Sequence, residues 1–355
     1  MKRALRDHRV LLLDQRGTGM STPVTADGLV RRGSPKEQAS YLTHFRADSI
    51  VDDAELIRKT LIGESGRWSI LGQSFGGFCA LRYMSQAPDS LSAVFITGGI
   101  PPLELTADDV YRATFHRVRE QNSLFFDRYP DAQELSDSIA DRLAASPVTL
   151  PNGDALTPRR FQQLGISFGS SDGFEQIYYL LERAMMNPPD LSLSFLRAVE
   201  GCGSFDTNPL YAILHEAIYC QETASNWSAH RIRDEFPEFQ YETGRPLRFT
   251  GEMVYPWMFE EYGQLAPIRE AANILAARDD WPRLYDIQTL GKNSVPAAAV
   301  VYYDDMYVER PFSEESARKI PGLKLWITNQ YEHNGLRADG ERILDRLIAM
   351  VRGYA

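Results

Sequence analysis

A serine stands where an apolar stretch of the chain gives way to a helix-like one. The run Gly72–Gly76 reads G-Q-S-F-G, and it follows the apolar run Trp68–Leu71. A strand-to-helix corner is too tight for side chains on both sides of such a serine, so glycines flank it and its hydroxyl is pushed to the C-terminal edge of a sheet. A hydroxyl presented in this way can attack a carbonyl carbon. The spacing therefore predicts that Ser74 is a nucleophile and that the backbone N–H of Phe75 binds the oxyanion.

The candidate base for this serine lies late in the chain. His333 follows the strand-like run Lys324–Thr328 and precedes the helix-like run Gly340–Ile348. A histidine in this position can take the proton of the serine and return it to the leaving group. We interpret the remaining histidines as structural or surface residues: His8, His44, His116, His215 and His230.

The candidate acid is one of two adjacent aspartates. Asp304 and Asp305 follow the strand-like run Ala297–Tyr303. Neighbouring side chains on an extended segment point in opposite directions, so the sequence leaves open which of the two faces His333. We favour Asp305, the first residue beyond the strand-like half of the pair. The order serine, aspartate, histidine, with the last two each on a loop after a strand, is that of the α/β-hydrolases.

The elements around the serine alternate between strand and helix. The sequence predicts a buried strand at Arg9–Asp14, an amphipathic helix at Asp48–Leu61, the serine corner, and a strand at Ala93–Gly99. The aliphatic positions of the predicted helix are Ile50, Val51, Ala54, Leu56, Ile57 and Leu61. This alternation is typical of a parallel α/β architecture.

The middle of the chain has a different pattern. Residues 105–285 are helical stretches with few strand signals, and the α/β pattern resumes from about Asp286. We predict an α/β-hydrolase domain, a mostly parallel sheet flanked by helices, from residues 1–104 and 286–355. The segment 105–285 would be a helical cap inserted after the sixth strand of that fold. A cap excludes water and shapes the pocket that selects the substrate.

Composition limits the classes of function. The chain has 355 residues, 43% of them hydrophobic, and a formal net charge of −10, which argues against nucleic-acid binding and favours cationic ligands. Its first residues lack the apolar core of a signal peptide, and no run approaches the length of a membrane span. The three cysteines, Cys79, Cys202 and Cys220, are odd in number and lack metal-ligand spacing. We therefore predict a cytoplasmic protein with structural thiols.

Three motifs in register resemble those of one family. They are Asp14–Pro23 (D-Q-R-G-T-G-M-S-T-P), Gly72–Gly77 and Thr97–Pro102. Together they resemble the prolyl aminopeptidases, also called proline iminopeptidases, which are serine exopeptidases of the α/β-hydrolase fold. Further segments extend the resemblance over nearly the whole chain: Leu210–Tyr219, Asp304–Val308 and His333–Arg337. The resemblance implies release of an N-terminal proline from a peptide or amide through an acyl-enzyme, with no metal or other cofactor.

An exopeptidase of this kind must recognise a free, protonated amine. Burying a cation under a cap is costly unless carboxylates meet it, so acidic cap residues are expected. Glu216 is the preferred candidate because it stands in the segment that resembles the amine-binding motif of the family, and Glu252 is the second. The alternative for either is a solvated helix face. Tyr219 and Trp257 could wall the proline ring, although aromatic residues in a helical cap are more often packing.

Two features near the amino terminus qualify this assignment. Asp14 and Arg16 are interpreted as a structural pair that stabilises their turn. Relatives carry an earlier strand that ends in an H-G-G-P-G type loop and contributes to the oxyanion hole, and the chain contains no such loop. The missing strand would lie between Arg9–Asp14 and the serine strand, leaving a slot in the sheet. We therefore expect that Met1 is an internal start or that the chain is a fragment of a longer polypeptide. Otherwise we expect that peptidase activity is low or absent, or that another segment fills the slot.

Two other functions compete with the peptidase. The first is another α/β-hydrolase, such as an esterase or amidase, whereas an epoxide hydrolase would need aspartate at position 74. The second is a catalytically impaired hydrolase fold that acts as a binding protein.

Overall fold

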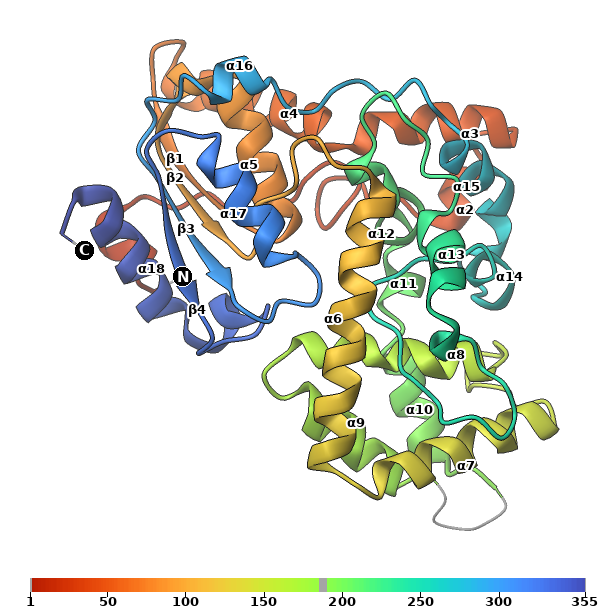
Figure 1. Cartoon of the computed structure of the whole chain (residues 1–355). Helices are drawn as coiled ribbons and strands as arrows, with labels where there is room; N and C mark the ends of the chain where they lie inside the picture. Colours follow the sequence, from red (N-terminus) through yellow and green to blue (C-terminus); the bar gives the residue numbers. More distant parts are fainter. Residues whose placement is uncertain (1, 185–189, 355) are drawn as a thin grey trace.

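A parallel sheet of four strands lies on the left of Figure 1, and most of the helices that follow β2 lie to its right. The computed structural model describes residues 2–184 and 190–354. The strands are β1 (Trp68–Gln73), β2 (Leu91–Thr97), β3 (Ala297–Tyr302) and β4 (Leu323–Thr328). They lie in the order β1-β2-β3-β4, and every neighbouring pair is parallel. The predicted strands after residue 60 are confirmed, and their carboxyl ends lie at one edge of the sheet.

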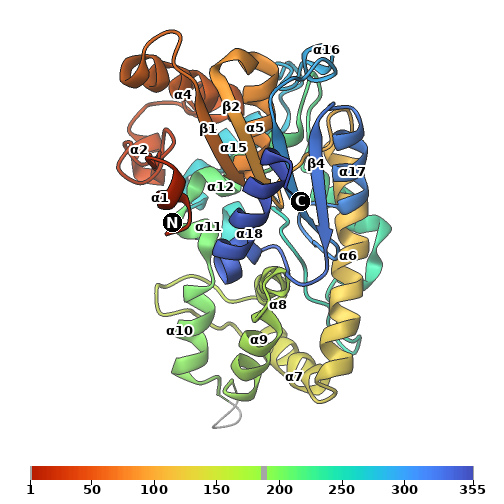
Figure 2. The same cartoon turned by 90° about the vertical axis from the view of Figure 1, so that its left-hand side faces the viewer.

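Helices cover both faces of this sheet, because alternate side chains of each strand point to opposite sides. Val94 and Ile96 of β2 pack in one core with residues of α5, whereas Ala93 and Phe95 pack in a second core with residues of α18. Figure 2 shows α18 in front of the sheet. The helices that flank the sheet are α4 (Ala47–Ile62), α5 (Phe75–Gln86), η2 (Pro88–Ser90), α16 (Ile287–Leu290), α17 (Arg310–Arg318) and α18 (Gly335–Arg352).

Between β2 and β3 the regular elements of the described chain are helices joined by loops, apart from one antiparallel bridge between Thr149 and Ala155. The longer helices of this region are α6 (Ala107–Arg128), α7 (Ala132–Ala145), α9 (Gly173–Glu182), α10 (Leu193–Gly201) and α15 (Arg269–Ala276). The shorter ones are α8 (Pro158–Gln162), η3 (Gln163–Gly169), α11 (Ser204–Thr207), α12 (Pro209–Leu214), η4 (Glu216–Tyr219), α13 (Ser228–Ile232), η5 (Arg233–Glu235), η6 (Pro237–Phe239), α14 (Met258–Glu261) and η7 (Ala266–Ile268).

These helices share one aromatic-rich core, and part of the amino-terminal region joins it. The elements before β1 are α1 (Ala4–Asp7), α2 (Ala26–Val30), α3 (Pro35–Leu42) and η1 (Thr43–Phe45), followed by α4. Helix α3 packs on α15, and α2 packs on η7 (Figure 1). The division into a hydrolase domain and a cap of residues 105–285 stays a proposal, and α2 and α3 pack with the cap side of it.

The predicted strand at Arg9–Asp14 is wrong. This segment has no regular structure, and Leu11, Leu12 and Leu13 are 53%, 74% and 44% exposed. A strand forms only where a neighbouring strand takes up its N–H and C=O groups, and β1, at the end of the sheet, pairs only with β2 within the described residues. The apolar run therefore stays exposed.

The predicted helix at Asp48–Leu61 is confirmed as α4, but one part of its predicted apolar face is wrong. Ile50 and Val51 are buried, whereas Leu56 and Leu61 are 66% and 60% exposed. The buried stripe of α4 includes Ala47, Val51 and Arg58. Leu56, five residues after Val51, lies outside this stripe, and Leu61 stands in the last turn of the helix. A helical period alone does not say how much of a helix its neighbours cover.

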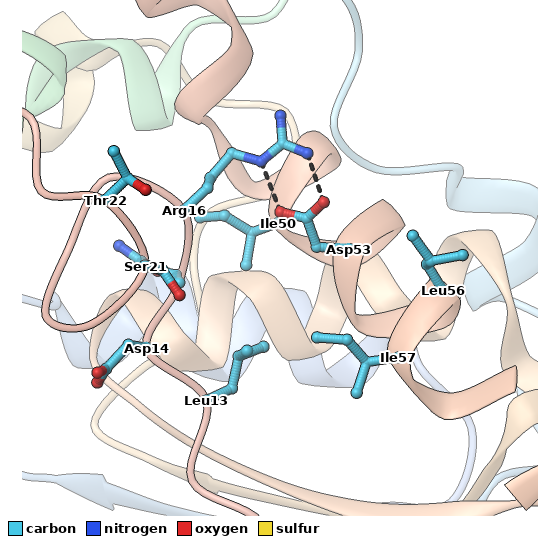
Figure 3. A pocket seen from close by; sticks show the side chains of 10 residues that line it. Leu13, Asp14, Arg16, Ser21, Thr22, Ile50, Asp53, Leu56 and Ile57 are labelled. Carbon is cyan, nitrogen blue, oxygen red and sulfur yellow. Dashed lines mark hydrogen bonds and ion pairs between the residues drawn. The ribbon is translucent and has the colours of Figure 1, made fainter. Parts of the chain in front are cut away.

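The sequence predicts that Asp14 and Arg16 pair with each other, but each has a different partner in the structure. Arg16 Nε and Nη2 donate to the two carboxylate oxygens of Asp53 on α4, at 2.7 and 2.6 Å (Figure 3). Asp14 instead accepts a hydrogen bond from the backbone N–H of Met20 at 2.8 Å. Both residues are structural, but they do not pair with each other. The pocket in Figure 3, of about 310 Å³, lies between this loop and α4.

In the part of the chain that the structure describes, none of the helices combines the length and the apolar character that crossing a bilayer requires.

Candidate active site

Ser74 stands at the sharp turn between β1 and α5. Its backbone has φ 53° and ψ −123°, a left-handed conformation that non-glycine residues rarely adopt. Two hydrogen bonds hold this turn: Ser74 N–H donates to the Thr97 carbonyl at 3.0 Å, and the Ser74 carbonyl accepts from Gly77 N–H at 2.7 Å. Phe75 is the first residue of α5, where backbone N–H groups have no partner within the helix. The turn therefore has the geometry expected of a nucleophile elbow.

Close backbone contacts explain two of the glycines around Ser74. A Cβ on Gly72 would lie 2.1 Å from the Gly76 carbonyl oxygen, and one on Gly77 would lie 2.2 Å from the Gly99 carbonyl oxygen. A Cβ on Gly76 would meet nothing within 4 Å. The second glycine of the G-x-S-x-G run is thus not required by space, whereas the glycine after it is.

The structure brings Asp305 and His333 together. The Asp305 side chain is 1% exposed, and its Oδ2 lies 2.7 Å from His333 Nδ1. Its other oxygen, Oδ1, accepts hydrogen bonds from the N–H groups of Tyr307 and Val308 at 2.9 and 3.0 Å. Asp304, the alternative acid, is exposed. Both oxygens of Asp305 are therefore held, one by its own loop and one by the imidazole.

The His333 ring is fixed by its surroundings. Its backbone N–H donates to the Gly169 carbonyl at 3.1 Å, and its ring meets the Tyr307 ring edge-on, with centroids 4.7 Å apart. Because Nδ1 faces Asp305, Nε2 is the nitrogen left to act as a base.

Two adjacent glycines after β2 show that Ser74 and His333 lie at the same corner. A Cβ on Gly98 would come within 3.2 Å of His333 Nδ1, and one on Gly99 within 3.0 Å of Ser74 N. These two glycines are consecutive, so their Cα atoms are about 3.8 Å apart. The side chains of Ser74 and His333 do not hydrogen-bond to each other. Catalytic hydrogen bonds are often long before substrate binds, so this geometry is compatible with closure.

The charges around His333 favour its protonated form. Burial acts to lower the pKa of His333, but the charge and hydrogen bond of Asp305, together with the charge of Glu252, outweigh it and raise the pKa above its usual value. The neighbouring Glu332 is also perturbed, since burial and the charges of Asp304 and Asp305 raise its pKa to about 7.

Glu252 is the cap carboxylate that faces the catalytic corner. It accepts a hydrogen bond from the Tyr211 hydroxyl, and its charge acts on His333. It also contributes, after burial, to raising the pKa of Tyr219 and of Tyr307. The residue before it, Gly251, lies beside the loop that carries Asp305, since a Cβ on Gly251 would come within 3.1 Å of Met306 Cε.

Glu216 has a different place from the one expected. It is buried, and its two carboxylate oxygens accept from the backbone N–H groups of Ser228 and Ala229, at 3.0 and 2.9 Å. These N–H groups open α13, where the first turn of a helix leaves donors unsatisfied. Burial raises the pKa of Glu216, against the lowering effect of those same hydrogen bonds. The preference for Glu216 over Glu252 as the amine-binding residue is therefore not supported by the contacts.

The two aromatic candidates also separate. Tyr219 is buried, and its ring packs edge-on against Phe78 of α5, with centroids 5.7 Å apart, next to the elbow. Trp257 instead stacks on Tyr255 and lies under the guanidinium of Arg159. These are packing contacts, and a role for Trp257 in substrate binding stays a prediction.

Three tyrosines of this region were not singled out from the sequence. Tyr211 bonds to Glu252, Tyr307 packs on His333, and Tyr111 is fully buried with no hydrogen-bond partner for its hydroxyl in the described structure. Tyr211 and Tyr307 both lie within the segments that resemble the family. Tyr111 carries no such signal.

No group of three or more histidine, cysteine, aspartate or glutamate side chains in residues 2–184 and 190–354 is arranged to hold a metal ion.

Comparisons with known proteins show which proteins this chain is similar to. The model of the α/β-hydrolase fold family matches residues 1–185. The chain is 52% identical over 352 residues to the proline iminopeptidase of Aeromonas sobria, covering 99% of this chain and 82% of that protein. It is 35% identical over 356 residues to the proline iminopeptidase aneH of Aspergillus aculeatus, covering 97% and 78%. A solved proline iminopeptidase from Mycobacterium smegmatis matches 96% of the chain and 78% of its own, at 13% identity and a TM-score of 0.43.

The chain is therefore an α/β-hydrolase, with a sheet, an elbow and an acid–histidine pair in the order of that class. Within the class, its identity to curated relatives over almost its whole length shows the family. It belongs to the proline iminopeptidases.

Replacing Gly77 by alanine should lower the free energy of unfolding by about 3 kcal/mol, because the new Cβ would overlap the Gly99 carbonyl. Gly76→Ala is the matched control, with open space around its Cβ and an expected change within about 1 kcal/mol. Urea unfolding of the two variants measures both values. Equal losses would show that the approach of Gly77 to Gly99 does not determine the corner.

Asp305→Asn should reduce kcat by about 1,000- to 10,000-fold, because the amide no longer holds His333 in the required tautomer and charge state. Asp304→Asn should stay within about a factor of two, as for a surface substitution. Steady-state kinetics of the two variants decide between the adjacent aspartates. A larger loss in Asp304→Asn would reverse the assignment.

The pH profile should reflect the raised pKa of His333. The base must be neutral, and a raised pKa keeps its proton to higher pH, so kcat/KM should fall on acidification through a pKa above the ordinary value of about 6.5. Glu252→Gln removes one charge that raises this pKa and should move the acid limb to lower pH. An unmoved limb would place Glu252 outside electrostatic reach of the imidazole.

Proposed function

We propose that this protein is a serine exopeptidase that releases N-terminal proline from peptides through an acyl-enzyme. The observation that carries the proposal is the buried Asp305–His333 pair at the same corner as the strained Ser74. Proline iminopeptidases that match nearly the whole chain support the choice of substrate.

In the first half of the reaction, Ser74 Oγ attacks the carbonyl carbon of the proline residue while His333 Nε2 takes the hydroxyl proton. Asp305 stabilises the imidazolium that forms. The tetrahedral intermediate then collapses, the carbon–nitrogen bond breaks, and His333 returns the proton to the departing amine. Proline remains as an ester on Ser74.

In the second half, a water molecule attacks this ester. His333 takes a proton from the water and returns it to Ser74 Oγ as the ester bond breaks. The products are free proline and the shortened peptide.

Recognition of the substrate amine is assigned to Glu252. The protonated secondary amine of an N-terminal proline loses its hydration under the cap, and a carboxylate that is not already occupied by backbone donors can replace that hydration. Glu252 bonds only to the Tyr211 hydroxyl among the described residues, whereas both oxygens of Glu216 are occupied. The phenol rings of Tyr219 and Tyr307 lie in the same neighbourhood and offer apolar walls for the pyrrolidine ring.

The oxyanion site supports a second candidate, a catalytically impaired hydrolase. The backbone N–H of Phe75 at the start of α5 is the one oxyanion donor assigned among the described residues. Loss of an oxyanion donor typically reduces kcat by about 100- to 1,000-fold. An esterase or amidase is the remaining alternative, since the same corner can attack any activated carbonyl.

The proposal includes a cytoplasmic location and a peptide or amino-acid amide as the partner. Cys79, Cys202 and Cys220 are free thiols in the described structure, which supports a reducing compartment.

Glu252→Gln should raise KM for proline 4-nitroanilide by about 30-fold, or about 2 kcal/mol, because a desolvated charge pair with the substrate amine is lost. Hydrolysis of a small neutral ester should change little in this variant. Both substrates are measured by steady-state kinetics, with Ser74→Ala as the inactive reference.

Glu216→Gln is the comparison variant. It should reduce thermal stability and affect both substrates alike, because the side chain caps α13. Proline release that survives in Ser74→Ala would contradict the mechanism. Ester turnover without proline release would favour the esterase, and a failure of a serine-directed inhibitor to label Ser74 would favour the impaired hydrolase.

A further inference from the structure

Helix α6 is the longest helix of the cap and passes beside the loop that follows β3 (Figure 1). It begins with a capping box in which the side chains of Thr106 and Asp109 each accept a bond from the other's backbone N–H. The face of α6 that carries Val118, Gln121 and Asn122 is buried. Side chains of α6 contact the segment that carries Asp305 and the segment that carries Glu252.

The first contact is an ion pair to the loop that carries Asp305. Arg117 Nε and Nη2 donate to the two oxygens of Glu309, at 2.8 and 2.9 Å. The two side chains are 17% and 7% exposed, so the pair is largely shielded from water. The loop has a second anchor one helical turn further along, where Gln121 Nε2 approaches the Asp304 carbonyl at 3.5 Å. Helix α6 thus holds both ends of the segment 304–309.

The second contact is to the segment that carries Glu252. The Asn122 side chain donates to the Phe249 carbonyl at 2.9 Å and accepts from the Phe249 N–H at 2.8 Å. Gly251 lies against the same helix, since a Cβ there would meet Val118 Cγ2 at 2.6 Å. It would also meet Met306 Cε at 3.1 Å, so the two held segments touch each other at this point.

These contacts come from two adjoining rows of one helix. Arg117 and Gln121 are four residues apart, and so are Val118 and Asn122, so each pair lies on one side of the rigid helix. The first row contacts the loop of Asp305, and the second contacts the irregular segment before Glu252. The separation of the two carboxylates is therefore set through α6, although neither carboxylate belongs to it.

We propose that Arg117 and Asn122 are positioning residues of the active site: Arg117 acts through the loop of Asp305 on His333, and Asn122 acts through Phe249 on Glu252. The inference rests on the proposed function for the role of Glu252, and on geometry alone for the coupling of Arg117 to the Asp305–His333 pair.

The test compares two variants with two controls on the same helix. Arg117→Met removes the ion pair to Glu309, and Asn122→Ala removes the clamp on Phe249. Arg112→Met is the control for the first variant, because Arg112 also makes a bidentate ion pair, with Glu235 of the cap, but both side chains of this pair are exposed. Ser123→Ala is the control for the second, because Ser123 is exposed and bonds only to the Arg119 carbonyl among the described residues.

Three readouts separate positioning from stability. The pKa of His333 is followed by NMR of histidine-labelled protein, with His333→Gln for assignment. The rate at which a fluorophosphonate labels Ser74 measures the acid–base pair without substrate recognition. The kinetics of proline 4-nitroanilide and of a neutral ester give kcat and KM separately.

In Arg117→Met we expect the pKa of His333 to fall, and the labelling rate and the kcat of both substrates to fall by about 10- to 100-fold, as for a small displacement of a reacting group. In Asn122→Ala we expect KM for the proline substrate to rise by about tenfold, with labelling and ester kcat retained. Both controls should match the unmodified protein. Arg117→Lys, which keeps the charge, should recover part of the lost rate and replaces Arg117→Met if that variant does not fold.

Failure of the inference differs from failure of the proposed function. If the unmodified protein releases proline but Arg117→Met behaves like Arg112→Met in the pKa of His333 and in labelling, α6 does not position the pair and the inference is overturned. If the unmodified protein releases no proline, the proposed function fails, and the His333 pKa in Arg117→Met still decides whether α6 positions Asp305.

Discussion

The hydrogen bond between Asp305 and His333 is the interaction on which the site depends. It joins a side chain that is 1% exposed to an imidazole enclosed by aromatic rings. An ionised carboxylate is costly to bury, and here two backbone N–H groups and the imidazole offset that cost. The arrangement needs the carboxyl ends of β3 and β4 side by side, which their parallel pairing provides. The sheet therefore places the pair, and the cap encloses it.

Two glutamates of the cap show how surroundings decide the role of a residue type. Glu216 lies opposite the opening turn of α13, and both of its oxygens bond to that turn. Glu252 accepts a hydrogen bond from the Tyr211 hydroxyl, its one hydrogen-bond partner among the described residues, and its charge acts on His333. A buried carboxylate occupied by backbone donors completes the fold, whereas one with spare capacity can meet a cation.

The parts of the site that follow from local spacing were predictable from the sequence. The elbow, the strand before it and the strands before Asp305 and His333 depend on runs of a few residues, and each of these elements is present. The predictions that failed depend on neighbours. Arg9–Asp14 is apolar enough for a strand but has no partner, and Leu61 has the right helical period but stands in the last turn of α4, where it is 60% exposed. The preference for Glu216 as the amine-binding residue stays a prediction that its contacts do not favour, because the helix start that occupies its carboxylate lies outside the segment that contains it.

The backbone at Ser74 has a consequence for the evolution of this protein. A residue held at φ 53° and ψ −123° costs of order 1–3 kcal/mol relative to a relaxed position, and glycine alone would adopt that conformation without strain. The fold would accordingly gain stability by giving up the hydroxyl. Selection for stability alone would favour glycine at this corner. The serine at position 74 is therefore a residue that selection for function explains and selection for stability does not.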